Sequence, residues 1–510
     1  MTIPRTGNKL NLNCGALFRF GLLIIILFAV LFPAVSHSTE SLIAAVDFKS
    51  MIQNSVKISP DCRHVAYVVK KDEKQTVVVD GKEDKLYDGI GSGFLVFSPD
   101  SRHVAYAALT GNKQSVVAHG KEGKQYDGIG TGSLVFSPDS RHVAYAAMMS
   151  DKWGMVVDGK EQKRYDAIGT APVFSPDSTR VAYAAKVGNK QIVVVDGKEQ
   201  EQYDVIGSES LVFSLDSKRV AYVAMMGNRQ FVVVDGREQK QYDVIDSGSL
   251  VFSPDSTRVA YTAKMGNTWF AVVDGKEEKP YDIIGSGSLV FSPDSKQVAY
   301  IAKTRNMWLV VANGKEGKQY EVIGSGSLIF SPNSKQVAYT AKTGNTWLVV
   351  VDGKEGKPCD GIGSRSLVFS PDGTRMAYAA KAGNTWLVVV NGKEGKPYDV
   401  IIEGSLVFSP DSTRIAYGAM MEKKQFVVVD NKEQKPYDVI GSRSLVFSSD
   451  SRHVAYAAKL NKLHFAVVDG EEGKQHNIIV RGKIVFDSDK TLHYLALNGN
   501  RIFLEEMELP

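Results

Sequence analysis

From residue 57 to its C-terminal end, the chain repeats one pattern of apolar and polar residues about every 39 positions. The tyrosine of a Val-Ala-Tyr triplet, or of its equivalent, marks the register, and its spacing is constant except for two steps that are one position shorter. These tyrosines are Tyr67, Tyr106, Tyr145, Tyr183, Tyr222, Tyr261, Tyr300, Tyr339, Tyr378, Tyr417, Tyr456 and Tyr494. A period of this length predicts an array of small structural units that stack on one another.

Each unit has the pattern of four short β-strands, as residues 289–324 illustrate. Strands are predicted at 289–292, 297–302, 308–312 and 320–323, where apolar residues alternate with polar ones or run together and β-branched residues are frequent. Pro-Asp-Ser, Gly-Asn and Asp-Gly sequences separate the strands in most units, and they favour tight turns. The repeat lacks the apolar period of a helix, which excludes helical solenoids.

The fourth predicted strand has the features of a sheet edge. Several units place proline in it, at Pro280, Pro358, Pro397 and Pro436, and a central strand would not tolerate the missing N–H. A sheet built from a single repeat is too small to be stable alone, so neighbouring units must bury one another's faces.

The repeat resembles a known family. Ser-Pro-Asp-Ser-x-x-Val-Ala-Tyr, then an apolar strand ending in Asp-Gly, then a short closing strand, resembles the WD-like repeats of TolB-type β-propellers. The pattern is also similar to the blades of the N-terminal propeller of dipeptidyl peptidase IV relatives. The resemblance implies an all-β propeller of about twelve four-stranded blades over residues 39–510.

The arrangement of twelve blades has three possible forms. A single ring is favoured because no linker interrupts the period, although known propellers typically hold four to eight blades. Two six-bladed rings and an open array are the alternatives. The last unit, 483–509, supplies only three strands, and residues 42–53 begin like the tail of a repeat. We therefore expect the segment 42–53 to complete the last blade.

The segment 1–38 has a different composition from the rest. Its only charges are Arg5, Lys9 and Arg19, and an apolar run follows at residues 20–35. This pattern predicts a secretory signal or, if it is not cleaved, an N-terminal membrane anchor. The propeller would then be periplasmic or secreted, or anchored with its blades outside the cytoplasm, and only residues 20–35 of an uncleaved chain would contact the membrane.

Charge and cysteine content narrow the possible partners. The segment 1–38 holds three of the basic residues and none of the acidic ones, so the rest of the chain is almost exactly balanced in charge. Such a chain offers no basic surface for nucleic acid. Cys62 and Cys359 would lie in different blades, so we expect two separate thiols.

The histidines do not predict a catalytic or metal site. His64, His103, His142 and His453 share one repeat position with arginine and glutamine, which is typical of a solvated strand start. The remaining histidines of the repeats lack the spacing of metal ligands; they are His119, His464, His476 and His493. We therefore expect no catalytic residues, no metal and no cofactor.

Tryptophan gives the one candidate binding surface. At the start of the third strand, some units carry tryptophan and others carry glutamine at the same position. This exchange favours a partly exposed position, because a buried amide without hydrogen-bond partners is costly. Trp269, Trp308, Trp347 and Trp386 fall in successive units, and Asn267, Asn345 and Asn384 lie beside three of them. This arc is a candidate ligand site; packing between blades is the alternative explanation.

Three hypotheses for function follow. The first is a non-enzymatic scaffold outside the cytoplasm that binds an envelope protein or a glycan through one propeller face. The second is a propeller hydrolase or lyase, or an accessory subunit of an envelope enzyme. The third is a structural spacer, which the plain repetition would suit.

Overall fold

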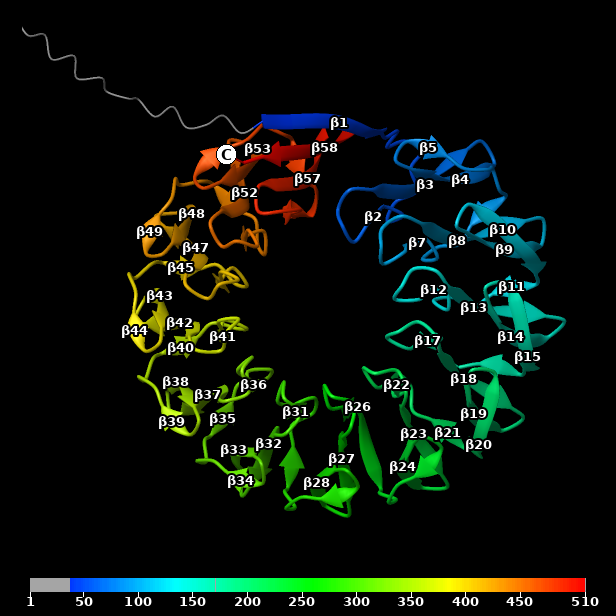
Figure 1. Cartoon of the computed structure of the whole chain (residues 1–510), viewed down its shortest axis with the longest axis horizontal. Coiled ribbons are helices and arrows are strands. Elements are labelled where there is room, and N and C mark those ends of the chain that lie inside the picture. The colour runs from blue at the N-terminus through cyan, green and yellow to red at the C-terminus, as the bar shows by residue number, and fades with distance from the viewer. Residues whose placement is uncertain (1–36, 170, 510) are drawn as a thin grey trace, which may run out of the picture.

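A computed structural model of the protein describes residues 37–169 and 171–509, and these residues form twelve antiparallel sheets in one closed ring (Figure 1). The prediction of a single twelve-bladed ring is confirmed, and the two six-bladed rings and the open array are not found. Residues 1–36 of the predicted signal or anchor segment 1–38, including the apolar run 20–35, lie outside the described residues, and residues 37 and 38 belong to the strand β1 (His37–Ala45). Among the residues described, no helix is long and apolar enough to cross a membrane.

Blades are numbered 1 to 12 in chain order, and blade 7 shows how one unit folds. Its innermost strand comes in two pieces, β30 (Ile283–Ile284) and β31 (Val290–Phe291), which both pair with the long second strand β32 (Val298–Thr304). The third strand is β33 (Met307–Ala312), and the outermost is β34 (Lys315–Glu316). The predicted first three strands therefore lie close to their observed bounds.

The other blades have the same long second and third strands. The second strands of the other blades are β3 (Val65–Lys71), β8 (Val104–Thr110), β13 (Val143–Met149), β18 (Val181–Val187), β23 (Val220–Met226), β27 (Val259–Met265), β37 (Val337–Thr343), β42 (Met376–Ala382), β47 (Ile415–Met421), β52 (Val454–Leu460) and β57 (Thr491–Asn498). Their third strands are β4 (Lys74–Val79), β9 (Lys113–Ala118), β14 (Lys152–Val157), β19 (Lys190–Val195), β24 (Arg229–Val234), β28 (Thr268–Val273), β38 (Thr346–Val351), β43 (Thr385–Val390), β48 (Lys424–Val429), β53 (Leu463–Val468) and β58 (Arg501–Glu508).

Most of the flanking strands are short, but β1 and β26 (Val244–Phe252) have nine residues each, and β26 is a continuous innermost strand. The innermost pieces are β2 (Lys57–Ile58), β6 (Gly89–Ile90), β7 (Val96–Phe97), β11 (Gly128–Ile129), β12 (Val135–Phe136), β16 (Ala167–Ile168), β17 (Val173–Phe174), β21 (Val205–Ile206), β22 (Val212–Phe213), β26 (Val244–Phe252), β35 (Val322–Ile323), β36 (Ile329–Phe330), β40 (Gly361–Ile362), β41 (Val368–Phe369), β45 (Val400–Ile401), β46 (Val407–Phe408), β50 (Val439–Ile440), β51 (Val446–Phe447), β55 (Ile478–Ile479) and β56 (Val485–Phe486). The outermost strands are β5 (Lys82–Glu83), β10 (Lys121–Tyr126), β15 (Lys160–Tyr165), β20 (Lys198–Tyr203), β25 (Arg237–Glu238), β29 (Lys276–Glu277), β39 (Lys354–Glu355), β44 (Lys393–Glu394), β49 (Lys432–Glu433), β54 (Glu471–Glu472) and β1 (His37–Ala45). A 3₁₀ turn, η1 (Val480–Gly482), separates β55 from β56.

The predicted fourth strand at 320–323 is wrong. Tyr320 bridges to Trp308 at the outer edge of blade 7, whereas β35 pairs with β37 in blade 8. The chain crosses from one sheet to the next at Glu321, so a single apolar run serves two blades. The edge prolines lie just before this crossing; Pro280, for example, stands between β29 and Tyr281.

The Gly-Ser sequences interrupt the innermost strand for a structural reason. In blade 8 the chain turns at residues 325–326, and Ser327 Oγ donates to the carbonyl of Gly324 at 2.7 Å. The same Oγ accepts the N–H of Thr340 in β37 at 3.1 Å. The serine therefore supplies the acceptor that the interrupted strand would otherwise have offered to the second strand.

The hydrophobic core lies between blades. Tyr261 and Val272 of blade 6 pack on blade 5, whereas Ala260 and Ala271 of the same sheet pack on blade 7. At most of these contacts a tyrosine from the outer edge of one blade meets the Val-Ala-Tyr tyrosine of the next; Tyr281 and Tyr300, for example, lie 6.1 Å apart at 72°. Such edge-to-face pairs contribute about 1 kcal/mol beyond the area they bury, so each blade depends on its neighbours.

The N-terminal strand closes the ring. β1 pairs antiparallel with β58, and the two strands lie side by side where the blue and red ends of the chain meet (Figure 1). This closing strand contains residues 42–45 of the segment expected to complete the last blade. Residues beyond it belong to blade 1, where Met51 bridges to Val69. Arg63 of blade 1 pairs with Asp487 and Glu506 of blade 12, at 2.8 and 2.7 Å.

Candidate functional site

The antiparallel blades give the ring two chemically different faces. The turns after the first and third strands, typically Ser-Pro-Asp-Ser and Asp-Gly, lie at one end of the blades, here called the Asp-Gly face. The Gly-Asn turns, and the crossings between blades, lie at the opposite end, the Gly-Asn face. This follows from strand direction, because turns one and three of a four-stranded meander share an end.

The tryptophan arc lies at the Gly-Asn face. Trp269, Trp308, Trp347 and Trp386 stand in the second position of β28, β33, β38 and β43, in blades 6 to 9, and all four indoles are half-buried. Asn267, Asn345 and Asn384 are exposed in the preceding turns, and their side chains make no hydrogen bond to described residues. The structure thus places the predicted residues along one arc of the ring.

Five blades carry glutamine where the arc has tryptophan, and there the side chain ties two blades together. Gln191 Oε1 accepts the N–H of Ile206, in the first strand of the next blade, at 2.7 Å. The same bond, at 2.7–2.8 Å, is made by Gln75, Gln114, Gln230 and Gln425. The glutamine position is therefore a link between neighbouring blades.

The residue before the glutamine supplies a second link. Lys190 Nζ pairs with Asp204 of the next blade at 2.6 Å, and equivalent ion pairs join Lys74, Lys113, Lys152, Arg229 and Lys424 to the following blade. The Lys113 ammonium and the Ser150 N–H hold the pKa of Asp127 below its usual range. Together these two contacts form a Lys-Gln link.

Blades 6 to 9 lack both contacts. Threonine or methionine stands in the lysine position, at Thr268, Met307, Thr346 and Thr385. Within the described chain, the facing carboxylates make no ion pair; these are Asp282, Glu321, Asp360 and Asp399. The N–H groups that glutamine would bind likewise find no acceptor among described residues; these belong to Ile284, Ile323, Ile362 and Ile401.

The indoles instead border small clefts between blades. Trp347 lines a cleft of about 230 Å³ with Ile362 and the Gly-Ser turn of blade 9, and Trp386 lines one of similar volume with Ile401. A lysine of the neighbouring strand covers the ring in two blades, with Lys303 Nζ 5.5 Å from the centre of Trp308. Each of these indoles therefore packs between blades and keeps part of its surface exposed.

The histidine position at the start of the second strand does more than face solvent, which corrects the sequence-based expectation. His64 Nδ1 lies 2.7 Å from Asp80 Oδ2, and His142 and His453 make the same contact. Where arginine stands there, as at Arg258, its guanidinium lies 5.4 Å from the ring of Phe291 and donates to carbonyls of the next blade. The position therefore holds the strand start in place and, with arginine, joins two blades.

A different departure from the repeat lies between blades 11 and 12. His476 replaces the edge tyrosine and Glu505 occupies a valine position in β58, and both side chains are fully buried with 3.5 Å between Nε2 and Oε1. Burial lowers the pKa of His476 to about 4 and raises that of Glu505. Across the described chain, no group of three or more His, Cys, Asp or Glu could hold a metal ion, and Cys62 and Cys359 are unpaired thiols.

Comparison with known proteins adds little to this geometry. No protein-family model and no curated protein matches the chain. Among solved structures, TolB from Acinetobacter baumannii shares 18% identity over 43% of this chain and 64% of its own, with a TM-score of 0.23. The β-propeller domain of the Trilobed protease from Pyrococcus furiosus shares 15% identity over 54% and 96%, with a TM-score of 0.25.

A eukaryotic initiation factor structure shares 13% identity over 70% of this chain and 90% of its own, with a TM-score of 0.34. The neighbours thus include TolB, while the resemblance to dipeptidyl peptidase IV propellers stays a prediction. Likeness at this level concerns the fold alone and carries no statement about activity or ligand.

The sequence predicted the tryptophan arc but not that its blades lack the Lys-Gln link of the other blades. The change from Lys-Gln to Thr-Trp or Met-Trp is visible in the repeat. Its effect on the contact between blades depends on which backbone N–H faces the side chain, and only the fold shows this. The departures His119, His476 and Glu505 were also visible as exceptions, but only the fold shows which neighbours they meet.

Proposed function

We propose that the protein is a non-enzymatic binding scaffold outside the cytoplasm, periplasmic, secreted or anchored, which binds an envelope protein or a glycan through the tryptophan arc. The observation that carries this proposal is the joint loss of both Lys-Gln contacts in four successive blades that all carry tryptophan. A change that served packing alone would not need to remove the lysine as well. In blade 3, outside the arc, Trp153 follows Lys152, which still pairs with Asp166 of the next blade.

The chemistry of the arc suits a polar ligand with a flat or apolar face. Each repeat of the arc offers an indole surface, a carboxylate such as Asp360 and a backbone N–H such as that of Ile362. Indole faces stack on sugar rings and apolar side chains, while the carboxylate and the N–H supply an acceptor and a donor. Four copies in series would bind an extended partner more tightly than one copy, because later contacts become intramolecular.

Intrinsic fluorescence gives a direct test, because four of the five tryptophans belong to the arc. Titration with envelope glycans and with purified envelope proteins should change the emission of the parent chain. The test variant replaces Trp269, Trp308, Trp347 and Trp386 with glutamine and the preceding residues with lysine, which copies blades that fold in this protein.

A control variant changes only the preceding residues to lysine and keeps the indoles. Binding to the parent and to both variants is compared by calorimetry, because the variant without the four indoles has also lost most of the fluorescence signal. A partner that binds the parent, and that the variant without the four indoles loses, supports the proposal; equal binding by both overturns it. Cleavage of envelope material by the purified parent chain would favour the enzyme alternative instead.

A further inference from the structure

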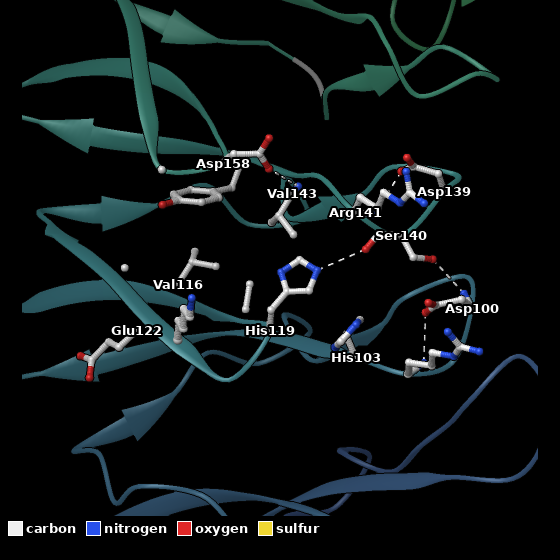
Figure 2. Close-up of a pocket in the computed structure, with 16 residues that line it drawn as sticks. Asp100, His103, Val116, His119, Glu122, Asp139, Ser140, Arg141, Val143 and Asp158 are labelled. Carbon is white, nitrogen blue, oxygen red and sulfur yellow. Dashed lines mark hydrogen bonds between the residues drawn. The ribbon is translucent and has the colours of Figure 1, made fainter.

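A second site stands apart from the tryptophan arc and is independent of the function proposed for it. A cleft of about 890 Å³ opens between blades 2 and 3 on the Asp-Gly face, several times larger than the clefts beside the indoles. Figure 2 shows His119 pointing into this cleft from blade 2, with His103 beside it and Asp158 and Arg141 on the side of blade 3.

A glycine lines the cleft on the side of blade 2, and blades 7, 8, 9 and 11 also have glycine at this position. The position of Gly123 is occupied by glutamine in blades 3, 4, 5 and 10, and the amide then lies over the turn of the next blade. In blade 3, Gln162 Oε1 accepts the hydroxyl of Tyr183 at 3.0 Å. At Gly123 no side chain fills this space; a Cβ there would lie 3.2 Å from the carbonyl oxygen of Val116 and 3.7 Å from Tyr145 Oη.

In other blades a carboxylate from the Asp-Gly turn holds the start of the second strand. In blades 1, 3 and 11 a histidine Nδ1 contacts one carboxylate oxygen at 2.6–2.7 Å. The N–H of the following residue donates to the other oxygen of the same aspartate at 2.9–3.0 Å. These two donors are therefore arranged to bind one carboxylate.

Blade 2 keeps both donors but has lost the carboxylate. His103 and Val104 occupy the donor positions, while His119 replaces the aspartate. His119 Nε2 donates to the carbonyl of Ser140 in blade 3 at 3.2 Å, and its ring lies 4.7 Å from that of His103. Within the described residues, His103 Nδ1 and the Val104 N–H have no acceptor, although ten other blades satisfy the equivalent N–H with Asp or Asn.

Charged side chains of both signs line the cleft. Arg102, Lys121 and Arg141 line the cleft and make no ion pair with a described residue. The four carboxylates that line it are already engaged by internal donors; these are Asp100, Glu122, Asp139 and Asp158. Asp100 and Asp139 each use one carboxylate oxygen for these bonds. The other groups still able to bind a ligand are cations and N–H donors.

We propose that a small molecule binds at this cleft through its carboxylate, with one oxygen on Nδ1 of His103, which lines the cleft, and the other on the N–H of Val104, the next residue in the chain. The ligand carboxylate takes the place that an internal Asp or Asn side chain holds in ten other blades. Arg102 and Arg141 add positive charge around it, and a volume of this size accommodates a body much larger than acetate. A planar group with two oxygens matches the donor pair better than tetrahedral phosphate does.

The test compares carboxylates with neutral molecules of similar shape. Glucuronate and glucose, and acetate and acetamide, are titrated at millimolar concentration into the full chain, with inorganic phosphate as a second anion. Binding is measured by calorimetry and by the shifts of the histidine ring resonances in NMR spectra. We expect the carboxylate of each pair to bind and to shift His103 and His119, while its neutral counterpart does neither.

Two variants locate the site. His119→Asp restores the pattern of the other blades, so its own carboxylate should occupy the donors and weaken carboxylate binding at least tenfold. Gly123→Gln should fill the cleft and weaken glucuronate more than acetate. Gly317→Gln makes the same change between blades 7 and 8, where Asn313 holds the strand start, and should leave binding unchanged.

The proposal is overturned if no carboxylate binds better than its neutral counterpart, or if phosphate binds better than every carboxylate. It is also overturned if His119→Asp binds carboxylates as well as the parent chain does. Because His119→Asp copies a sequence found in neighbouring blades, loss of folding is not expected, and a circular dichroism spectrum of each variant checks this.

Discussion

Blades 4 and 5 and blades 6 to 9 share a backbone and a core, yet each group is joined to the following blade differently. In the former, Gln191 and Lys190 or their equivalents reach across and bind backbone and carboxylate of the next sheet. In the latter, an indole fills the same position, and the facing carboxylate and N–H lack those partners within the described chain. Contact between blades therefore does not require the lysine and glutamine contacts at every position. In blades 6 to 9 the carboxylate and the backbone N–H are left available to a ligand.

The contact between blades 11 and 12 departs furthest from both groups, because it buries a histidine beside a glutamate, His476 and Glu505. The folded-state pKa of His476 is about 4 against 6.5 for the free side chain, so the unfolded chain binds more protons between these values. The histidine's contribution is therefore complete above pH 6.5 and is lost as the pH falls towards 4, by up to about 3 kcal/mol. Glu505, whose pKa is raised, acts in the opposite direction.

His476→Tyr, which copies the other blades, isolates the histidine contribution. We expect the variant to gain stability relative to the parent as the pH falls from 6.5 to 4, measured by urea unfolding at each pH. A parallel pH dependence in parent and variant would show that the buried imidazole does not control this contact.

Truncating an indole should have the next largest effect on the free energy of unfolding. It also tests whether glutamine can replace tryptophan at the contact between two blades. Trp308→Ala removes half-buried surface between blades 7 and 8 and should cost about 2 kcal/mol in the free energy of unfolding. Trp308→Gln should cost less, because the amide can accept the N–H of Ile323 as it does in the Lys-Gln blades. Urea unfolding of both variants measures the difference; equal losses would mean that glutamine cannot replace tryptophan here.

Removing a glutamine link should matter less. Gln191→Ala leaves the Ile206 N–H without its acceptor and should cost about 1 kcal/mol. Hydrogen exchange gives the sharper measurement, since the Ile206 amide should exchange faster while amides of blade 9 remain unchanged. Unchanged exchange at Ile206 would contradict the role assigned to the glutamine.

The ion pair of the Lys-Gln link should contribute least. Lys190 and Asp204 are each more than a third exposed, so Lys190→Thr should cost no more than about 0.5 kcal/mol. Unfolding measured at low and at high salt should show this difference disappear as the charges are screened. A difference that persists in high salt would mean that lysine packing matters more than its charge.

The repeat predicted the ring because turn residues and apolar runs are local signals. It could not divide the run at 320–323, since nothing in that run marks where the chain crosses between sheets at Glu321. The candidate arc was predictable from the exchange of tryptophan for glutamine, but the partner of that glutamine is a backbone N–H, which every residue except proline carries. His119 was visible as an exception, but its importance depends on His103 and Val104, two donors that only the hairpin brings near.

Closing the ring with β1 has a consequence for the order of events during folding. Most contacts link residues within two adjacent repeats, whereas β1 must wait for β58, which follows all the other strands of the ring in chain order. A chain of nearly identical units could join the wrong ends or add a neighbouring molecule's blade. The contact that closes the ring, between blade 1 and blade 12, uses side chains that no other contact uses: Arg63 pairs there with Asp487 and Glu506. The irregular ends therefore favour the correct circle over an open polymer of chains.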